Sequence, residues 1–196
     1  MKYPTDHKSK TRERLLQEAS KAFRADGPER MSIAAVMKGA GMTVGGFYAH
    51  FASKDDLIAE AVNYMFEERY AAFFAHIDTP NPREALTRFV EFYVSMRHRD
   101  AKVGGCPIPP LGGQVPNLPP TAQERFQAAV DRLADGVTEL LQAMDVPDAS
   151  QRAGAALAEM IGAISLARLT RDDIRAKTLL ETALRSVKTR LCLIPA

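Results

Sequence analysis

The sequence has no tryptophan and only two cysteines, Cys106 and Cys192, among its 196 residues. Two cysteines cannot build a disulfide framework, which excludes the disulfide-rich secreted class. The longest nearly apolar run, 153–167, contains Glu159 and is shorter than the ~20 residues that cross a bilayer. The polar start MKYPTDHKSKTRER has no apolar segment of the kind found in secretory signals. We therefore expect a cytoplasmic protein without a membrane partner.

Metal sites and catalytic motifs are also missing from the sequence. Its four histidines show no ligand spacing with one another or with cysteine. There is no glycine-rich phosphate loop and no nucleophile with an evident base. The sequence therefore predicts no metal, no cofactor, no catalytic residue and no enzyme activity.

Helical patterns cover almost the whole chain, and no stretch alternates like a strand over more than a few residues. Apolar residues recur at helical spacing after Lys10, and Gly27-Pro28 ends that helix. Two short helices follow, one capped by Ser32 and one capped by Thr43 that covers 44–51. The sequence predicts an all-α fold.

Five longer helices are predicted from the cap residues Ser53, Asn81, Thr121, Asp148 and Thr170. The helix after Ser53 has an apolar stripe that continues to Ile77, and the last two helices cover about 149–168 and 171–190. Residues 102–120 hold four glycines and six of the chain's twelve prolines. That segment can form only a turn or two of helix, around 108–115.

Charge is distributed unevenly along the chain. Residues 1–54 contain ten Lys and Arg against five Asp and Glu, a balance of +5. The other 142 residues contain 16 against 19, a balance of −3, which gives the chain its net charge of +2. A basic head on a weakly acidic remainder favours a polyanionic partner.

The two short helices have the layout of a helix–turn–helix, because the first ends at Gly41 and the second starts at Thr43. Helices joined so closely cross steeply, which leaves the second free to enter a DNA major groove. Residues 10–63 resemble the DNA-binding domain of the TetR family of transcriptional repressors. The resemblance is carried by KTRERLLQEASKAF and by the run GMTVGGFYAHFASK, residues 41–54.

The resemblance implies two domains, a three-helix DNA-binding domain over 1–53 and an effector-binding and dimerisation domain of about six helices over 54–196. Positions that contact DNA phosphates in the family correspond here to Thr43, Tyr48, His50 and Lys54. Positions that contact base edges correspond to Val44, Gly45 and Gly46. Because these three offer few hydrogen-bonding groups, specificity is expected to depend on DNA shape, on Ser32 or on a basic N-terminal arm with Lys8, Lys10 and Arg12.

Structural roles compete with DNA contact at several of these positions. Phe47 and Phe51 are expected to be core residues that hold the short helix. Tyr48 is expected to point outward, with a core position as the alternative. His50 is either a phosphate ligand or an ordinary surface histidine, and Lys10 is either a DNA contact or part of a solvated tail.

The last two helices are rich in small residues that allow close helix packing: Ala153, Gly154, Ala155, Ala156, Ala158, Gly162 and Ala163. In the TetR family the corresponding helices pair with their copies across a two-fold axis. The resemblance thus implies a homodimer that presents two heads to double-stranded operator DNA. The alternative is that the apolar stripes of these helices belong only to the core of the monomer.

Aromatic and methionine side chains between the head and these helices could line an effector pocket, although most are expected to be plain core. The candidates are Met65, Phe66, Tyr70, Phe92, Met96 and Phe126. Cys106 follows Arg97, His98 and Arg99 closely, and cations near its sulfur would favour a reactive thiolate. Some regulators resembling this one use a Gly-Cys here as a redox or electrophile sensor; the alternative is an inert, packed thiol.

The sequence thus predicts a TetR-like one-component repressor that binds a palindromic operator as a dimer and is released by a small molecule. One alternative is a regulator that senses oxidants or electrophiles through Cys106. An alternative of another class is a helical small-molecule carrier or enzyme that does not bind DNA.

Overall fold

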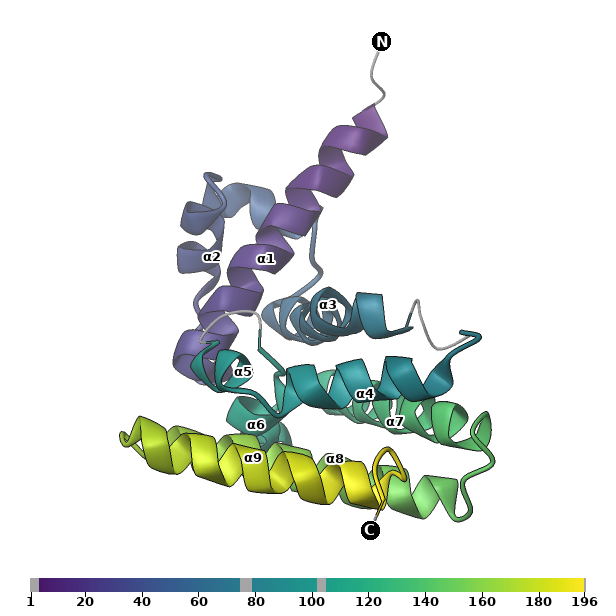
Figure 1. Cartoon of the computed structure of the whole chain (residues 1–196). Coiled ribbons are helices and arrows are strands. Elements are labelled where there is room, and N and C mark those ends of the chain that lie inside the picture. The colour runs from purple at the N-terminus through teal and green to yellow at the C-terminus, as the bar shows by residue number, and fades with distance from the viewer. Residues whose placement is uncertain (1–3, 75–78, 102–104, 196) are drawn as a thin grey trace. The chain divides into compact units, whose positions relative to one another are not determined.

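A computed structural model describes residues 4–74, 79–101 and 105–195, and within these ranges the regular structure is helical, without a strand (Figure 1). The prediction of an all-α fold is confirmed. The α-helices are α1 (Pro4–Arg30), α2 (Ile33–Gly39), α3 (Lys54–Phe74), α4 (Pro82–Tyr93), α5 (Met96–Asp100), α6 (Ile108–Leu111), α7 (Pro120–Gln142), α8 (Ala149–Leu169) and α9 (Asp173–Arg190). Two 3₁₀ helices are η1 (Val44–Ala49) and η2 (Gly112–Asn117).

The chain divides into two compact units, each discontinuous in sequence. The first contains Met1–Glu68 with Leu111–Ala128, and the second contains Arg69–Pro110 with Ala129–Ala196. All three boundaries fall inside helices, so α3, α6 and α7 each contribute residues to both units. The division into 1–53 and 54–196 concerns functional domains and stays a prediction.

The core of the first unit is built from apolar faces of α1, α2, η1 and α3. Leu15, Ala19 and Phe23 recur at helical spacing along α1 and are buried. Gly27 has a φ of +80° and a non-helical ψ, so the regular path of α1 ends where the glycine and the following proline predict. Arg14 on α1 donates to the carbonyl of Ala40 at the end of α2, at 2.6 Å.

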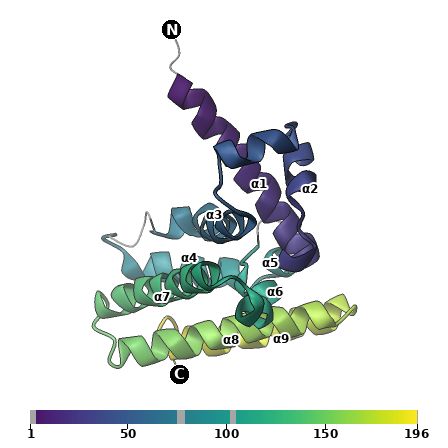
Figure 2. The same cartoon turned by 180° about the vertical axis from the view of Figure 1, so that it is seen from behind.

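In the second unit, α8 and α9 lie side by side along much of their length (Figures 1 and 2). Small residues are buried on one face of α8, at Ala153, Ala156 and Ala163, which allows close packing. Gly154 on α8 remains exposed. Apolar side chains are also exposed near the ends of both helices, with Leu166 56%, Leu169 81% and Ile174 81% accessible.

Three predicted N-caps are confirmed. The hydroxyl of Ser32 accepts from Ala35 N–H at 3.1 Å, and the hydroxyl of Ser53 accepts from Asp56 N–H at 3.0 Å. The amide oxygen of Asn81 accepts from the N–H of Glu84 at 3.1 Å, and the Glu84 carboxylate accepts from the Asn81 amide in return.

The second short helix differs from its prediction. Residues 44–49 form a 3₁₀ helix rather than an α-helix over 44–51, and the side chain of Thr43 makes no capping hydrogen bond. Gly46 N–H donates to the carbonyl of Thr43 three residues earlier, which is the 3₁₀ pattern. Gly45 and Gly46 have low helix propensity, which explains why an α-helix does not form.

The longer helices also depart from some predicted ends. Thr121 is not a cap, because α7 already begins at Pro120, a residue favoured at the first helical position. The cap of α9 is Asp172, whose carboxylate accepts from two backbone amides, while Thr170 lies at the end of α8. Asp148 precedes α8 with a φ of +55° and no side-chain capping bond. The predicted end near Ile77 lies outside the described residues.

Candidate nucleic-acid interface and ligand cavity

The turn between α2 and η1 is formed by backbone geometry. Gly41 has a φ of +72°, in the left-handed region that glycine adopts at helix ends. The N–H of Gly41 donates to the carbonyl of Lys38 at 3.0 Å, and the N–H of Met42 donates to that of Met37 at 2.8 Å. Two short helices are therefore joined by a tight turn, as the helix–turn–helix pattern predicts.

η1 has a buried face and an exposed face. Phe47 is buried on η1, and Phe51 is buried just after it, with their ring centroids 5.7 Å apart, which confirms both as core residues. Tyr48 packs edge-on against Phe47 at 5.2 Å between centroids, yet it is 74% exposed. Val44 is 51% exposed. The prediction that Tyr48 points outward is confirmed, and its hydroxyl is accessible to a partner.

The other predicted phosphate contacts lie in the same segment. Thr43 is exposed, and Lys54 is half-buried at the first position of α3. His50 is half-buried; burial lowers its pKa, and the charges of Lys8 and Arg12 lower that pKa further. The positive charge of α1 therefore acts on His50, next to the exposed face of η1.

The remaining predicted DNA contacts differ in whether their side chains already have a partner within the chain and in how much space surrounds them. Ser32 is exposed, but its hydroxyl already caps α2. Lys10 is exposed on α1. A Cβ added at Gly45 would meet no atom within 4 Å, whereas one at Gly46 would lie 3.5 Å from the methyl group of Met42. Packing within the chain leaves room for a side chain at Gly45, so the bare backbone there can approach a partner closely.

Comparison with known proteins agrees with this geometry. Residues 15–61 match the family model described as bacterial regulatory proteins, tetR family. A TetR transcriptional regulator from Chloroflexus aurantiacus is 28% identical, with a TM-score of 0.79 over 95% of this chain and 96% of that one. Residues 15–61 therefore match the tetR family, and over nearly its whole length the chain resembles a TetR transcriptional regulator in fold.

Two further solved TetR-fold proteins extend this similarity at lower identity. A TetR-family regulator from Agrobacterium tumefaciens is 22% identical, with a TM-score of 0.75 over 91% of this chain and 98% of its own. NemR from E. coli, in its reduced form, is 19% identical, with a TM-score of 0.78 over 91% of this chain and 96% of its own. No curated protein matches the sequence significantly. At these identities the two structures support the TetR fold alone.

A cavity of about 450 Å³ lies in the second unit. One side is formed by the last turns of α3, with Arg69, Tyr70 and Phe73. The other side is formed by one face of α4 and the residues before it: Thr79, Asn81, Glu84, Ala85, Arg88, Phe89 and Phe92. Its size falls within the range of about 300–1,000 Å³ that is usual for small-molecule pockets.

The candidate pocket residues lie in three different surroundings. Tyr70 and Phe92 line the cavity. Met65, Phe66 and Phe126 are buried in the first unit, where the rings of Phe66 and Phe126 meet edge-on at 5.2 Å between centroids. Met96 is half-buried at the start of α5 and is not among the residues that line the cavity. Which of these residues contact an effector stays a prediction.

The sequence interpretation missed the charged part of this lining. Arg69 and Arg88 were not candidates, although Ala85, Arg88, Phe89 and Phe92 recur at helical spacing on one face of α4. That spacing was the available signal. It could not reveal that the same face meets Arg69, because the two helices are brought together only by the tertiary fold.

Cys106 is buried, and the sequence-based argument for a reactive thiolate does not hold for its surroundings. Its thiol accepts from the hydroxyl of Tyr93 at 3.3 Å and from the N–H of Ile108 at 3.4 Å. Burial raises the pKa of the Cys106 thiol, although these hydrogen bonds and the charge of Arg69 oppose that rise. Of the cationic neighbours considered, His98 contacts Cys106 through the backbone, with its Nε2 accepting from Cys106 N–H at 3.0 Å. A redox or electrophile sensor at Cys106 stays a prediction.

We expect the two cysteines to differ strongly in reactivity. In the native protein, Ellman's reagent should modify the half-buried Cys192 about 100-fold faster than Cys106, which must first be exposed by local opening. The measurement is the absorbance time course for the wild type and for Cys106→Ser and Cys192→Ser, each compared with the unfolded chain. If Cys106 reacted as fast as in the unfolded chain, burial would not protect it, and the thiol-sensing alternative would gain support.

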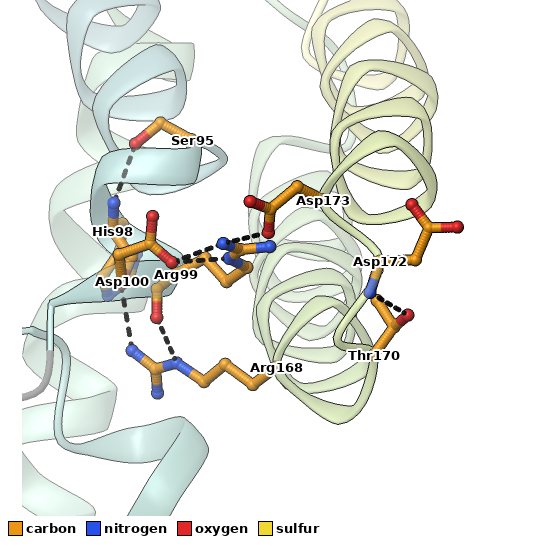
Figure 3. Close-up of polar contacts among 8 residues, drawn as sticks. All are labelled: Ser95, His98, Arg99, Asp100, Arg168, Thr170, Asp172 and Asp173. Carbon is orange, nitrogen blue, oxygen red and sulfur yellow. Dashed lines mark hydrogen bonds and ion pairs between the residues drawn. The ribbon is translucent and has the colours of Figure 1, made fainter.

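The segment before Cys106 is joined to α8 and α9 by a polar cluster within the second unit (Figure 3). Arg168 of α8 donates to the carbonyls of His98 and Arg99, both at 3.1 Å. The guanidinium of Arg99 lies 2.7 Å from Asp100 and 2.8 Å from Asp173, the first residue of α9. Three helices of the second unit therefore share one set of ion pairs and hydrogen bonds.

Two negative findings concern only the described residues. Within 4–74, 79–101 and 105–195, no group of three or more His, Cys, Asp or Glu side chains is placed to hold a metal ion. None of the helices in these ranges is sufficiently long and apolar to cross a membrane.

Proposed function

We propose that this chain is a one-component transcriptional repressor of the TetR family that binds a palindromic operator and is released by a small-molecule effector. The observation that carries the proposal is the exposed face of η1, where Tyr48 and Val44 lie outside a core formed by Phe47 and Phe51. Tyr48 packs one edge against Phe47 but is 74% exposed, so a DNA phosphate could reach its hydroxyl. As a repressor, the protein would act in the cytoplasm, where its operator lies.

The proposed DNA contacts follow the residues of this face. The hydroxyls of Thr43 and Tyr48, the imidazole of His50 and the ammonium of Lys54 bind phosphates, and Lys54 acts together with the N-terminal end of α3. Val44 contacts a thymine methyl group, while Gly45 and Gly46 let the backbone approach the base edges. Lys10 and Ser32 add contacts at the border of this surface.

We further propose that the chain acts as a homodimer through α8 and α9. Support comes from Leu166, Leu169 and Ile174, which expose large apolar surfaces on these two helices. A shallow groove over the same helices is lined by Gly162, Ala163, Leu166, Leu179 and Ala183, among others. Covering these residues with a second copy would bury apolar area and present two heads to successive major grooves.

α3 connects the cavity to the segment that is proposed to bind the operator. It is one continuous helix that begins with Lys54 and ends with residues that line the cavity, among them Arg69 and Phe73. A ligand that displaced the C-terminal end of α3 would therefore also shift its N-terminal end. It would favour a state in which the two DNA-binding domains of the dimer are not spaced to fit successive major grooves. If operator-bound and effector-bound structures had equal head separation, this route would be excluded.

The first experiment is a fluorescence-anisotropy titration of the purified protein on the intergenic DNA upstream of its own gene. A scrambled duplex of equal length is the control, and both are measured at two salt concentrations. A repressor should prefer its operator and lose affinity steeply as salt rises. Absence of binding to either duplex at low salt would reject the proposal in favour of a helical carrier or enzyme without DNA binding.

A further inference from the structure

The cavity of the second unit has an aromatic wall formed by both helices. The rings of Phe73 on α3 and Phe89 on α4 are stacked, with centroids 4.3 Å apart and planes inclined by 29°. Phe92 lies one helical turn beyond Phe89 and remains 40% exposed. Aromatic rings that line a concave site favour a flat, apolar ligand body, because aromatic surfaces gain from mutual burial and from stacking.

Positive charge exceeds negative charge around the cavity. Arg69 is held against the ring of Phe92, with the guanidinium carbon 4.0 Å from the ring centroid, and lies 5.8 Å from that of Tyr70. Arg88 extends from α4 and is largely exposed. Among the described residues that line the cavity, two guanidinium groups and one carboxylate, that of Glu84, therefore border the same space.

The Glu84 carboxylate is already engaged by its own helix. Glu84 accepts from the side-chain amide of Asn81 at 2.9 Å, as part of the N-terminal cap of α4. Its contact with Arg88 is a loose, exposed pair at 3.9 Å, which contributes little. A cationic ligand would thus meet two guanidinium groups and a carboxylate occupied by capping, whereas an anionic ligand would meet complementary charge.

We propose that this cavity binds a planar aromatic carboxylate, with the ring against Phe89 and Phe92 and the carboxylate on Arg69 and Arg88. The inference rests on the proposed function, since it names the chemical class of the effector. Guanidinium groups pair with carboxylates in a bidentate geometry, and they do so most strongly where water is partly excluded. Arg69 is half-buried and already oriented by the ring of Phe92, so little side-chain freedom is lost when an anion binds.

The test uses three probes with one ring system: 2-naphthoate, 2-naphthalenemethanol and 2-naphthylmethylammonium. Isothermal titration calorimetry on the protein without DNA should show that the carboxylate binds about 10- to 100-fold more tightly than the neutral alcohol, with the ammonium weakest. Equal affinity for carboxylate and alcohol would overturn the proposal, and so would preference for the ammonium.

Two variants locate the charge that is recognised. Arg69→Gln should lose about tenfold or more of its affinity for 2-naphthoate and keep its affinity for the alcohol. Arg88→Gln tests the second contact at an exposed position where the fold is unaffected, with an expected loss of a few-fold. Arg97→Gln is the matched control, because Arg97 also lies over Phe92, at 5.6 Å, but does not line the cavity. Unchanged 2-naphthoate affinity in both Arg69→Gln and Arg88→Gln would also overturn the proposal.

The binding experiment is independent of DNA, so its outcome is separate from that of the proposed function. If operator binding is found and 2-naphthoate does not bind, the ligand class is wrong and the repressor proposal remains. If 2-naphthoate binds in the charge-dependent manner and does not release DNA, the cavity assignment holds and its role as the effector site is wrong.

Discussion

Replacing Lys54 with glutamine is expected to lower the affinity for operator DNA by about 10- to 100-fold at about 100 mM salt. Lys54 is the first residue of α3, so its ammonium lies at the N-terminal end of a helix, where backbone amides also favour an anion. If Lys54 contacts a phosphate as proposed, the variant dimer would lose two such contacts. The slope of log K against log salt should therefore become shallower by about two units, and binding to unrelated duplexes should weaken in parallel.

Lys177→Gln is the matched control for this variant. Lys177 is an exposed lysine on α9, in the second unit, and pairs loosely with Glu181 at 3.8 Å. This substitution removes the same charge outside the face proposed to contact DNA, so the salt slope should stay unchanged in a variant that is still dimeric. Equal slopes for wild type and Lys54→Gln, with thermal melting showing that both are folded, would contradict a phosphate contact at Lys54.

Local cap chemistry explains why many helix starts could be predicted. Ser32, Ser53 and Asn81 each accept the backbone N–H three residues later, and this bond depends only on nearby sequence. The same locality made the turn at Gly41 predictable, because a positive φ is required there. The core position of Phe47 and the outward direction of Tyr48 came from the family resemblance and from the spacing of apolar residues.

The predicted starts of α7 and α9 were wrong because neighbouring residues compete to begin a helix. Thr121 belongs to a good capping box, yet Pro120 starts α7 one residue earlier. Thr170 is a plausible cap, but Asp172 offers a carboxylate that accepts two amides of α9. Such outcomes depend on small differences between adjacent residues, which sequence patterns do not resolve.

The surroundings of Cys106 and of the cavity depend on contacts between distant segments. Basic residues close in sequence to Cys106 suggested a stabilised thiolate, but the fold buries the sulfur against Tyr93 and raises its pKa. The pairing of Arg69 with Phe92 joins two helices, and neither residue indicates the other in the sequence. The burial of Cys106 and the balance of charges around the cavity therefore depend on the tertiary structure and cannot be read from the sequence.

The stability of the protein is expected to fall by about 2 kcal/mol between pH 7 and pH 5 because of His98 alone. Its imidazole is buried, with Nδ1 2.7 Å from the carbonyl of Tyr93 and Nε2 accepting from the N–H of Cys106. Since a backbone amide can only donate, Nε2 carries no proton, and Nδ1 donates to the Tyr93 carbonyl. A proton on Nε2 would place its N–H directly against the N–H of Cys106.

Burial therefore lowers the pKa of His98 from 6.5 to about 4; the bond to Tyr93 opposes this, and the charges of Arg69 and Arg168 add to it. Between these two values the unfolded chain takes up a proton that the folded chain does not, so folding is disfavoured as the pH falls through this window. Above pH 6.5 the imidazole is neutral in both states, and the effect vanishes.

Urea unfolding at pH 7 and pH 5, at one fixed protein concentration, measures this effect. His98→Asn keeps an amide donor for the Tyr93 carbonyl but does not titrate, so it should lose about 2 kcal/mol less than wild type between the two pH values. Carboxylates common to both proteins cancel in this comparison. His50→Asn removes a histidine that is only half-buried, and it should change the pH dependence less. If wild type and His98→Asn lost equal stability between pH 7 and pH 5, the His98 imidazole would not be held neutral. The bond from Cys106 N–H to His98 would then be absent, and only the hydrogen bonds of the Cys106 thiol would hold this residue.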